Sequence, residues 1–321
     1  YTWVTITPQG VRRKLEVQDM GLNLSGMTTE TRNPRTMQLD QMSPLEIVTV
    51  MNEEDARVPL AIAKCLPQIA QAVTWAAESF EKGGRLFYMG AGTSGRLGVL
   101  DAAECPPTFG VPKEMVVGLI AGGEKAFIEA VEGAEDSREL AVEDLKAHGL
   151  TANDLVVGIA ASGRTPYVLG GLDYAKSVGC HTAAIACNIG SAIGKAAELA
   201  IEVNCGPEVL TGSTRLKSGT AQKLILNMIS TGSMVRTGKA YQNLMVDVQQ
   251  TNEKLHTRAE NIVIDATGVE REKARAAIDA AGGSVKTAIT MLLADCDAAE
   301  AARRLEKARG HVREAIRLEV L

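Results

Sequence analysis

A glycine-rich segment, Gly90-Ala91-Gly92-Thr93-Ser94-Gly95-Arg96, holds residues suited to binding an anion. It follows the apolar run 86–89 and precedes the apolar-periodic segment 97–103, an order that predicts a strand, a turn and a helix. Glycine lets a backbone approach a ligand closely, and the unpaired amides at a helix N-terminus attract negative charge. Because Thr93 and Ser94 add hydroxyl donors between Gly92 and Gly95, the loop predicts a phosphate site.

The same loop lacks what nucleotide sites require. A Walker-type loop needs Gly-Lys-Ser/Thr, and no lysine stands here. The three glycines fit the spacing of a dinucleotide fingerprint, but that fingerprint also needs an acidic residue at the end of the next strand. The next strand candidate, 115–120, ends in Ala121-Gly122-Gly123. A phosphorylated metabolite is therefore favoured over NAD, and no cofactor is expected.

Two further loops carry similar chemistry. The strand candidate 155–160 is followed by Ser162, Gly163, Arg164 and Thr165, and then by a proline at the start of a helix. An ordinary helix cap would explain one such loop. Because the loops after strands 86–89 and 155–160 have similar chemistry and belong to one sheet, together they favour a bipartite anion pocket. The third loop, 206–217, contains Ser213 and ends in Lys217 at the entrance of a long helix, 218–234. Lys217 is either a contact for a ligand anion or a solvated lysine.

Two carboxylates near these loops are candidates for acid–base chemistry. Glu104 precedes two prolines that should end the helix 95–103, and the negative end of the helix dipole there favours a protonated acid. The alternative is an ordinary exposed glutamate at the end of a helix. Glu135 lies between two helical segments, where it or Asp136 could also be a simple capping residue. A helix from Ser94 to Glu104 spans about 15 Å, which separates Glu104 from the phosphate of its own subunit. A composite site at a dimer interface would bring them together.

The surrounding pattern predicts an α/β fold with a doubly wound parallel sheet. Short apolar strands at 86–89, 115–120, 155–160, 182–187 and 200–203 alternate with helical segments at 95–103, 124–133 continuing through 135–147, 166–178 and 191–198. Ligands of such sheets bind beyond the carboxyl ends of the strands. Before the first strand, Ser43-Pro44 predicts the start of a helix through Glu54, and 58–80 predicts a second.

Composition excludes several classes of function. The 321 residues are 45% hydrophobic with a formal charge of −5, which gives no footprint for nucleic acid or an anionic membrane surface. No apolar run is long enough to cross a bilayer. The six cysteines form no C-x-x-C pair, so no metal site is expected, and they are typical of buried residues in a reduced, cytoplasmic protein.

The two ends of the chain differ from its centre. Residues 1–26 show no sustained periodicity and no secretory signal, and an extension or disordered tail is expected there. From residue 258 three short helices (261–267, 270–281 and 285–293) and a final exposed helix over 297–314 are predicted. The expected domains are therefore 27–257 around the sheet and a small helical module at 258–321.

Several motifs, taken together, resemble the N-acetylmuramic acid 6-phosphate etherase family, and the resemblance covers about residues 27–315. The motifs are Gly90–Gly98, Asp101-Ala102-Ala103-Glu104-Cys105-Pro106-Pro107-Thr108, 131–136, 161–167, 212–223 and Asn243-Leu244-Met245-Val246-Asp247. The resemblance implies a sugar isomerase (SIS) domain that binds phosphosugars, a C-terminal module similar to ubiquitin-associated three-helix domains, and a homodimer. By motif, Glu104 matches the proton-donating acid of the family and Glu135 its second catalytic glutamate.

The resemblance also implies a reaction. The family cleaves the lactyl ether of N-acetylmuramic acid 6-phosphate to N-acetylglucosamine 6-phosphate and D-lactate during cell-wall recycling. Two alternatives remain open: an aldose–ketose isomerase on the same fold, which would release no lactate, and a sugar-phosphate-sensing protein similar to the glucokinase regulatory protein. That regulator is a longer chain with two such domains.

Overall fold

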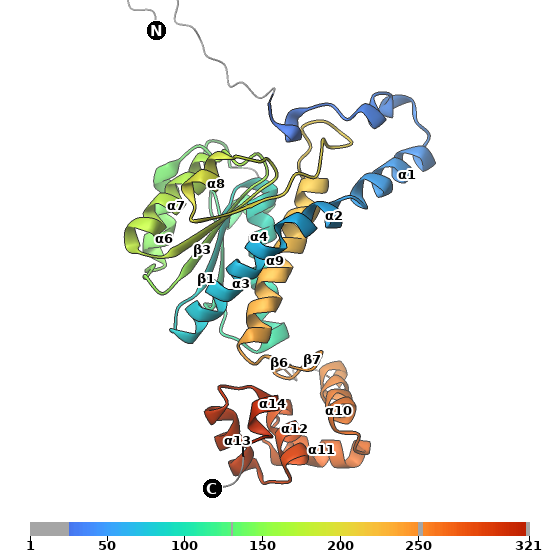
Figure 1. The fold of residues 1–321 in the computed structure, drawn as a ribbon, viewed down its shortest axis with the longest axis vertical. Coiled ribbons are helices and arrows are strands. Elements are labelled where there is room, and N and C mark those ends of the chain that lie inside the picture. Colours follow the sequence, from blue (N-terminus) through green and yellow to red (C-terminus); the bar gives the residue numbers. More distant parts are fainter. Residues whose placement is uncertain (1–25, 130, 250–252, 319–321) are drawn as a thin grey trace, which may run out of the picture.

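A parallel sheet of five strands forms the centre of the protein (Figure 1). The computed structural model describes residues 26–129, 131–249 and 253–318, so the tail predicted at 1–26 lies almost wholly outside the described residues. The strands are β1 (Leu86–Gly90), β2 (Val116–Ile120), β3 (Leu155–Ala160), β4 (His181–Ala186) and β5 (Leu199–Glu202), in the order β2-β1-β3-β4-β5. The doubly wound parallel sheet predicted from the alternating pattern is thus confirmed, with strand bounds that shift by at most one residue.

Each face of the sheet has its own layer of helices. Leu86 and Tyr88 of β1 point to a face covered by α3 (Leu66–Glu81), α4 (Gly92–Phe109) and α9 (Lys217–Arg236). Phe87 and Met89 point to the opposite face, which is covered by α6 (Arg138–Ala147), α7 (Pro166–Val178) and α8 (Ala192–Ala196). Successive side chains of a strand alternate between faces, so an apolar run without interruption is needed to fill both layers.

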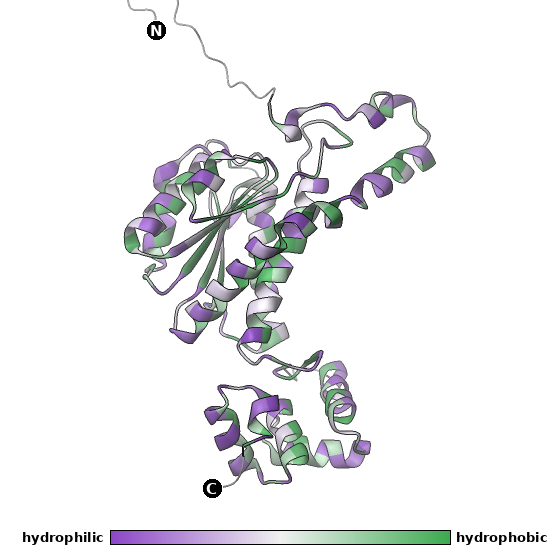
Figure 2. Ribbon diagram, viewed as in Figure 1, coloured by the Kyte–Doolittle hydropathy of each residue, from purple (hydrophilic) through white to green (hydrophobic). Residues whose placement is uncertain are grey.

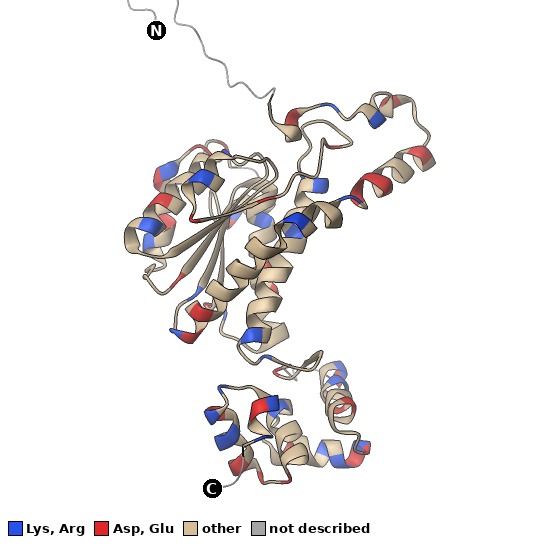
Figure 3. Cartoon of the chain, in the orientation of Figure 1, with Lys and Arg blue, Asp and Glu red and all other residues tan. Residues whose placement is uncertain are grey.

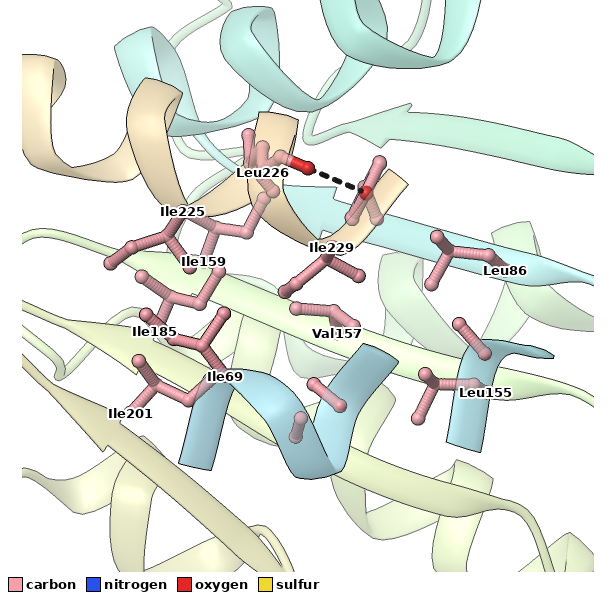
Figure 4. Packing of buried hydrophobic residues seen from close by; sticks show 14 of the residues in the cluster. Ile69, Leu86, Leu155, Val157, Ile159, Ile185, Ile201, Ile225, Leu226 and Ile229 are labelled. Atoms are coloured by element: carbon pink, nitrogen blue, oxygen red, sulfur yellow. Dashed lines mark hydrogen bonds between the residues drawn. The ribbon is translucent and has the colours of Figure 1, made fainter. Parts of the chain in front are cut away.

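The interior packing is almost entirely aliphatic. Figure 4 shows Ile69 of α3 and Ile225 of α9 against Ile159 and Ile185 of the sheet, and all four are buried. Burial of one such side chain contributes roughly 1.5–3 kcal/mol, so this layer holds α9 firmly against the sheet. In Figure 2 the strands are strongly hydrophobic, whereas the surrounding helices carry polar residues on their outer faces.

Several predicted helices have different bounds in the structure; the one predicted over 261–267, for example, begins at Glu253. The helix predicted over 58–80 is interrupted by a 3-10 turn at Ala63–Cys65 between α2 (Val58–Ile62) and α3, because Pro67 has no N–H to continue the ladder. The segment predicted as 124–133 continuing through 135–147 is a short α5 (Lys125–Ile128) and, after turns, α6. Ser137 begins α6 by accepting a hydrogen bond from the Leu140 amide.

The predicted end of α4 is wrong in a way that concerns the site. Pro106 and Pro107 lie inside the helix, which continues to Phe109 and ends at Gly110 in the left-handed conformation (φ 61°). Cys105 and Phe109 are buried in the core beside the sheet. Their packing outweighs the backbone hydrogen bonds that the prolines remove, so Glu104 is an interior residue of the helix rather than its last.

The N-terminal part projects away from the sheet (Figure 1). Three 3-10 turns (Thr28–Glu30, Pro34–Thr36 and Leu39–Gln41) lead to α1 (Pro44–Asp55). The predicted Ser43 cap is confirmed, since its side chain accepts from the Glu46 amide and the Glu46 carboxylate accepts from the Ser43 amide. Leu45 and Val48 on this helix are exposed by 74% and 58%.

The C-terminal region is helical and has a hydrophobic cluster of its own. A short hairpin, β6 (Ala240–Tyr241) and β7 (Leu244–Met245), precedes α10 (Glu253–Thr267), α11 (Arg271–Ala280), α12 (Val285–Ala294), α13 (Ala298–Lys307) and α14 (Val312–Ala315). The single final helix predicted over 297–314 is wrong, because Arg309 and Gly310 adopt positive φ between α13 and α14. Tyr241 and Val246 pack into the same cluster as α10–α14. Figure 3 shows both signs of charge on the outside of these helices.

Candidate active site

The strand order brings the first two predicted loops together. The chain passes from β1 outward to β2 and then crosses back to β3 on the other side of β1, so the winding reverses between β1 and β3. Parallel α/β sheets bind their ligands at this point, beyond the carboxyl ends of the strands. Gly90 pairs with Ile159 in register, and the 91–95 and 161–165 loops therefore leave the sheet side by side. The position of the two loops on neighbouring strands is the physical basis for the bipartite pocket predicted from the sequence.

The glycines of the first loop perform two separate tasks. Gly92 begins α4 with a φ of 51°, and a Cβ added there would have no other atom within 4 Å, which leaves room for a ligand. At Gly95 an added Cβ would lie 2.6 Å from the Gly90 carbonyl oxygen and 2.7 Å from Ile120 Cγ1. The spacing that resembles a dinucleotide fingerprint thus gives close contact of helix and strand at Gly95 and open backbone at Gly92.

Ser94 of this loop is linked to a residue that sequence reasoning missed. Its hydroxyl donates to Gln222 Oε1 of α9 at 3.0 Å, and both side chains are buried. Among the described residues Gln222 Nε2 has no hydrogen-bond partner. A buried donor without an acceptor is costly, so Gln222 is suited to face an acceptor of a bound ligand. Because α9 contains several other polar residues, Asn227 among them, no sequence signal distinguished Gln222. Thr93, one residue earlier, is half-buried.

The second loop forms one wall of a pocket of about 470 Å³. Ser162, Arg164 and Asn188 line it together with Lys195. Gly163 holds the turn with a φ of 75°, and a Cβ there would lie 2.4 Å from the Ser191 side chain. Within the described ranges neither Arg164 nor Lys195 takes part in an ion pair, whereas the Glu202 carboxylate near this pocket is bonded to the amides of Gly190 and Ser191.

Glu135 lies against the start of α7. Its Oε1 accepts a hydrogen bond of 2.9 Å from the Thr165 hydroxyl, and its carbonyl oxygen accepts one of 3.0 Å from the Tyr167 amide. Glu135 is exposed, whereas Thr165 is buried. The capping residue of α6 is Ser137, so Glu135 and Asp136 do not have the capping role considered as an alternative. The structure therefore brings one of the two candidate glutamates to the second loop.

Glu104 is not brought to the loops of its own chain. It lies twelve residues after Gly92, about 18 Å along α4 at 1.5 Å per residue. Its side chain is exposed, beside Leu100, which is also exposed by 49%. Because α4 continues to Phe109, Glu104 does not lie at the negative end of the helix dipole, as the sequence had predicted. The separation expected from the sequence is present in the structure.

Lys217 lies in a buried ionic cluster. Its ammonium donates to Glu54 Oε2 at 2.6 Å, and the lysine is only 1% exposed. Arg35 Nη1 lies 2.8 Å from Glu54 Oε1, and Asn33 also donates to this carboxylate. Burial alone would raise the pKa of Glu54, but the hydrogen bonds from Lys217 and Arg35 outweigh it and lower the pKa to about 2. Lys217 thus has a carboxylate partner within the protein.

A second buried carboxylate fixes the start of α9. Glu208 accepts hydrogen bonds from the backbone amides of Lys217 and Ser218 and from the Ser218 hydroxyl, each at 2.9 Å. A carboxylate is favourable at a helix N-terminus, where the amides are unpaired. Ser213, predicted as a ligand contact, is half-buried in the loop between Glu208 and Lys217. The two glutamates, 54 and 208, give this loop a defined position.

No group of three or more His, Cys, Asp and Glu side chains among the described residues is arranged to hold a metal ion. All six cysteines are free thiols, and five of them are buried. In the described part of the chain no helix is both long and apolar enough to cross a membrane.

Comparisons with known proteins identify the family. Residues 68–176 match the family described as "Glucokinase regulatory protein N-terminal SIS domain", and residues 139–231 match the SIS domain. The chain is 63% identical over 293 residues to N-acetylmuramic acid 6-phosphate etherase of Exiguobacterium sp., which covers 91% of this chain and 100% of the relative. It is 61% identical over 295 residues to the etherase of Serratia proteamaculans, covering 92% of this chain and 99% of the relative.

These relatives match the chain over nearly their full length, and the resemblance found in the motifs is confirmed. With its five-stranded parallel sheet and the two loops at the β1/β3 junction, the chain belongs to the N-acetylmuramic acid 6-phosphate etherase family.

Proposed function

We propose that this protein cleaves the lactyl ether of N-acetylmuramic acid 6-phosphate with water, giving N-acetylglucosamine 6-phosphate and D-lactate. The observation that carries the proposal is near full-length identity of about 60% to etherases, together with paired loops and an adjacent glutamate at the sheet's ligand-binding edge. The enzyme is then a carbon–oxygen lyase of amino sugar metabolism. The six free cysteines support its action in a reducing compartment, the cytoplasm.

The reaction proceeds by elimination and then hydration. Opening of the sugar ring exposes an aldehyde at C1, which makes the C2 proton acidic. A base removes that proton, the C3–O bond breaks, and the departing lactate oxygen takes a proton from an acid. Water then adds at C3 of the unsaturated aldehyde, and ring closure gives the product. The breaking and the forming of the C3–O bond are each accompanied by proton transfers, which two carboxyl groups can carry out.

The binding roles follow from the loops. The 91–95 and 161–164 loops bind the 6-phosphate, through backbone amides at the start of α4 and in the 161–164 loop and through the hydroxyls of Thr93 and Ser162. Gln222 completes this site with its unpaired amide. Arg164 binds the lactyl carboxylate, because it borders this pocket and forms no ion pair among the described residues. Lys217 supports the loop that contains Ser213 through its ion pair with Glu54.

The catalytic roles require two subunits. Glu135, beside the second loop, is the base that removes the C2 proton. Glu104 is the acid for the departing lactate, and it comes from the partner subunit because α4 carries it about 18 Å away from its own loops. The exposed apolar side chains of Leu45, Val48 and Leu100 support the burial of these helices in a homodimer.

Isotope labelling tests the reaction. The enzyme is incubated with N-acetylmuramic acid 6-phosphate in water enriched in ¹⁸O, and the products are analysed by mass spectrometry. Elimination and hydration place the label at C3 of the sugar product. Label in lactate would indicate displacement at the lactyl carbon, and an isomerised sugar without lactate would refute the etherase assignment.

Subunit mixing tests the shared site. E104Q and E135Q variants are each expected to be inactive as homodimers, whereas E132Q, which alters an exposed neighbour of Glu135, keeps full activity. A heterodimer of the two inactive chains contains one intact site if the glutamates come from different subunits. Random mixing should then restore about one quarter of the wild-type activity. No recovery would place both glutamates in one chain.

A further inference from the structure

Thr165 occupies the position before a helix but does not cap it. It is the residue immediately before α7, where a threonine hydroxyl commonly accepts a hydrogen bond from an amide of the first turn. No such bond is present, and the hydroxyl donates instead to Glu135 Oε1 at 2.9 Å. Thr165 is 4% exposed, so its end of this bond is shielded from water.

The main chain reinforces the same connection. The Tyr167 amide donates to the Glu135 carbonyl oxygen at 3.0 Å. The Tyr167 hydroxyl in turn donates to Asp144 Oδ2 of α6 at 2.5 Å. The turn that carries Glu135 is therefore attached to the start of α7 through both its backbone and its side chain.

A hydroxyl group carries a single proton to donate. The Thr165 proton is directed at the Glu135 carboxylate, so it is not available to a phosphate, whose oxygens are acceptors. The Ser162 hydroxyl and the amides of the loop have no such commitment to Glu135. Among the described residues Glu135 Oε2 makes no hydrogen bond, which leaves that oxygen open to a substrate proton.

We propose that Thr165 is a positioning residue that orients the Glu135 carboxylate toward the substrate, rather than a ligand of the phosphate. Its hydrogen bond occupies Oε1 and fixes the carboxylate plane, while Oε2 has no partner among the described residues. The inference rests on the proposed function, because it takes Glu135 to be the base. It reassigns a residue that the sequence placed among the substrate contacts.

The T165V variant separates the two roles, because valine keeps the shape of threonine and lacks the hydroxyl. We expect kcat to fall roughly 10- to 100-fold, the usual effect of a misplaced catalytic group, while KM and the Kd for N-acetylglucosamine 6-phosphate stay within about twofold. T165S retains the hydroxyl and should restore most of kcat. T290V removes an equally buried hydroxyl, whose bond to the Lys286 carbonyl is also 2.9 Å, and should change neither constant.

A rise of about tenfold in KM and in the product Kd, with kcat retained, would instead make Thr165 a phosphate ligand and overturn the inference. Circular dichroism and the product Kd establish that the variant is folded. If T165V does not fold, T165A gives the same comparison.

A double-variant cycle identifies the group through which Thr165 acts. If it acts through Glu135, adding T165V to E135Q lowers the residual rate no further. An undiminished effect of T165V in the E135Q background would show that the inference is wrong although Glu135 is catalytic. Wild-type activity of E135Q itself would refute the assignment of the base, and with it the proposed function of this residue.

Discussion

Replacement of Glu54 by glutamine tests the buried ionic cluster that joins the N-terminal segment to α9. The Glu54 carboxylate is 1% exposed and contacts Lys217, Arg35 and Asn33. Glutamine keeps the shape but removes the charge, and the Lys217 ammonium is then left buried without its partner. Removal of one member of a buried pair costs about 3–5 kcal/mol of unfolding free energy, and we expect E54Q to lose about this much at pH 7.

The lowered pKa of Glu54 gives a second value for its contribution to the free energy of unfolding. Glu54 titrates at about 2 in the folded protein against its ordinary 4.5, which corresponds to about 3 kcal/mol of stability. Because the folded pKa is the lower one, this stability is complete above about pH 5 and is lost as the pH falls toward 2. About 2 kcal/mol of it should be gone by pH 3.

The assay is urea unfolding of wild type, E54Q and the double variant E54Q/K217M, followed by circular dichroism at pH 7 and pH 3. The difference between wild type and E54Q should shrink at pH 3. The double variant should recover part of the loss at pH 7, since its buried ammonium is also removed. An E54Q variant as stable as wild type at pH 7, or a difference that grows at pH 3, would refute the reasoning.

Three further predictions concern separate features. G95A should abolish substrate binding or folding, because its Cβ would lie 2.6 Å from the Gly90 carbonyl oxygen. G92A, with open space at φ 51°, should lower the free energy of unfolding by only about 1 kcal/mol. Product titration and urea unfolding measure the two effects. Burial raises the pKa of Cys105 and Cys180 to about 12, so a thiol reagent at pH 8 should label the less buried Cys296 first, and rapid labelling of Cys105 in the native protein would contradict the core packing. Burial also raises the pKa of Asp101, so its ionisation opposes folding as the pH rises. The unfolding free energy of D101N, relative to that of wild type, should therefore be higher at pH 8 than at pH 4. The opposite trend would contradict the burial of this carboxylate.

Much of the fold was determined by local sequence signals. The apolar strands are continuous because both faces of the sheet are covered, and strand β3 and helix α7 have the predicted bounds. The Ser43 cap and the glycine turns of the two loops are equally local, since they depend on a few neighbouring residues. For the same reason the motifs quoted above, taken together, indicated the family that the relatives confirm.

Long-range packing decided the rest. Because Cys105 and Phe109 are buried in the core, α4 continues past Pro106 and Pro107, and this continuation cannot be predicted from the neighbouring residues alone. Glu54 and Lys217 are 163 residues apart in the chain, so only the folded protein could give the lysine its carboxylate partner. Likewise the sequence by itself indicated phosphate-binding loops and two glutamates, whereas the tertiary structure placed Glu135 at Thr165 and Glu104 far along α4. Hydroxyls and carboxylates can be recognised by type, but the partner that each one bonds is set by distances that exist only after the chain has folded.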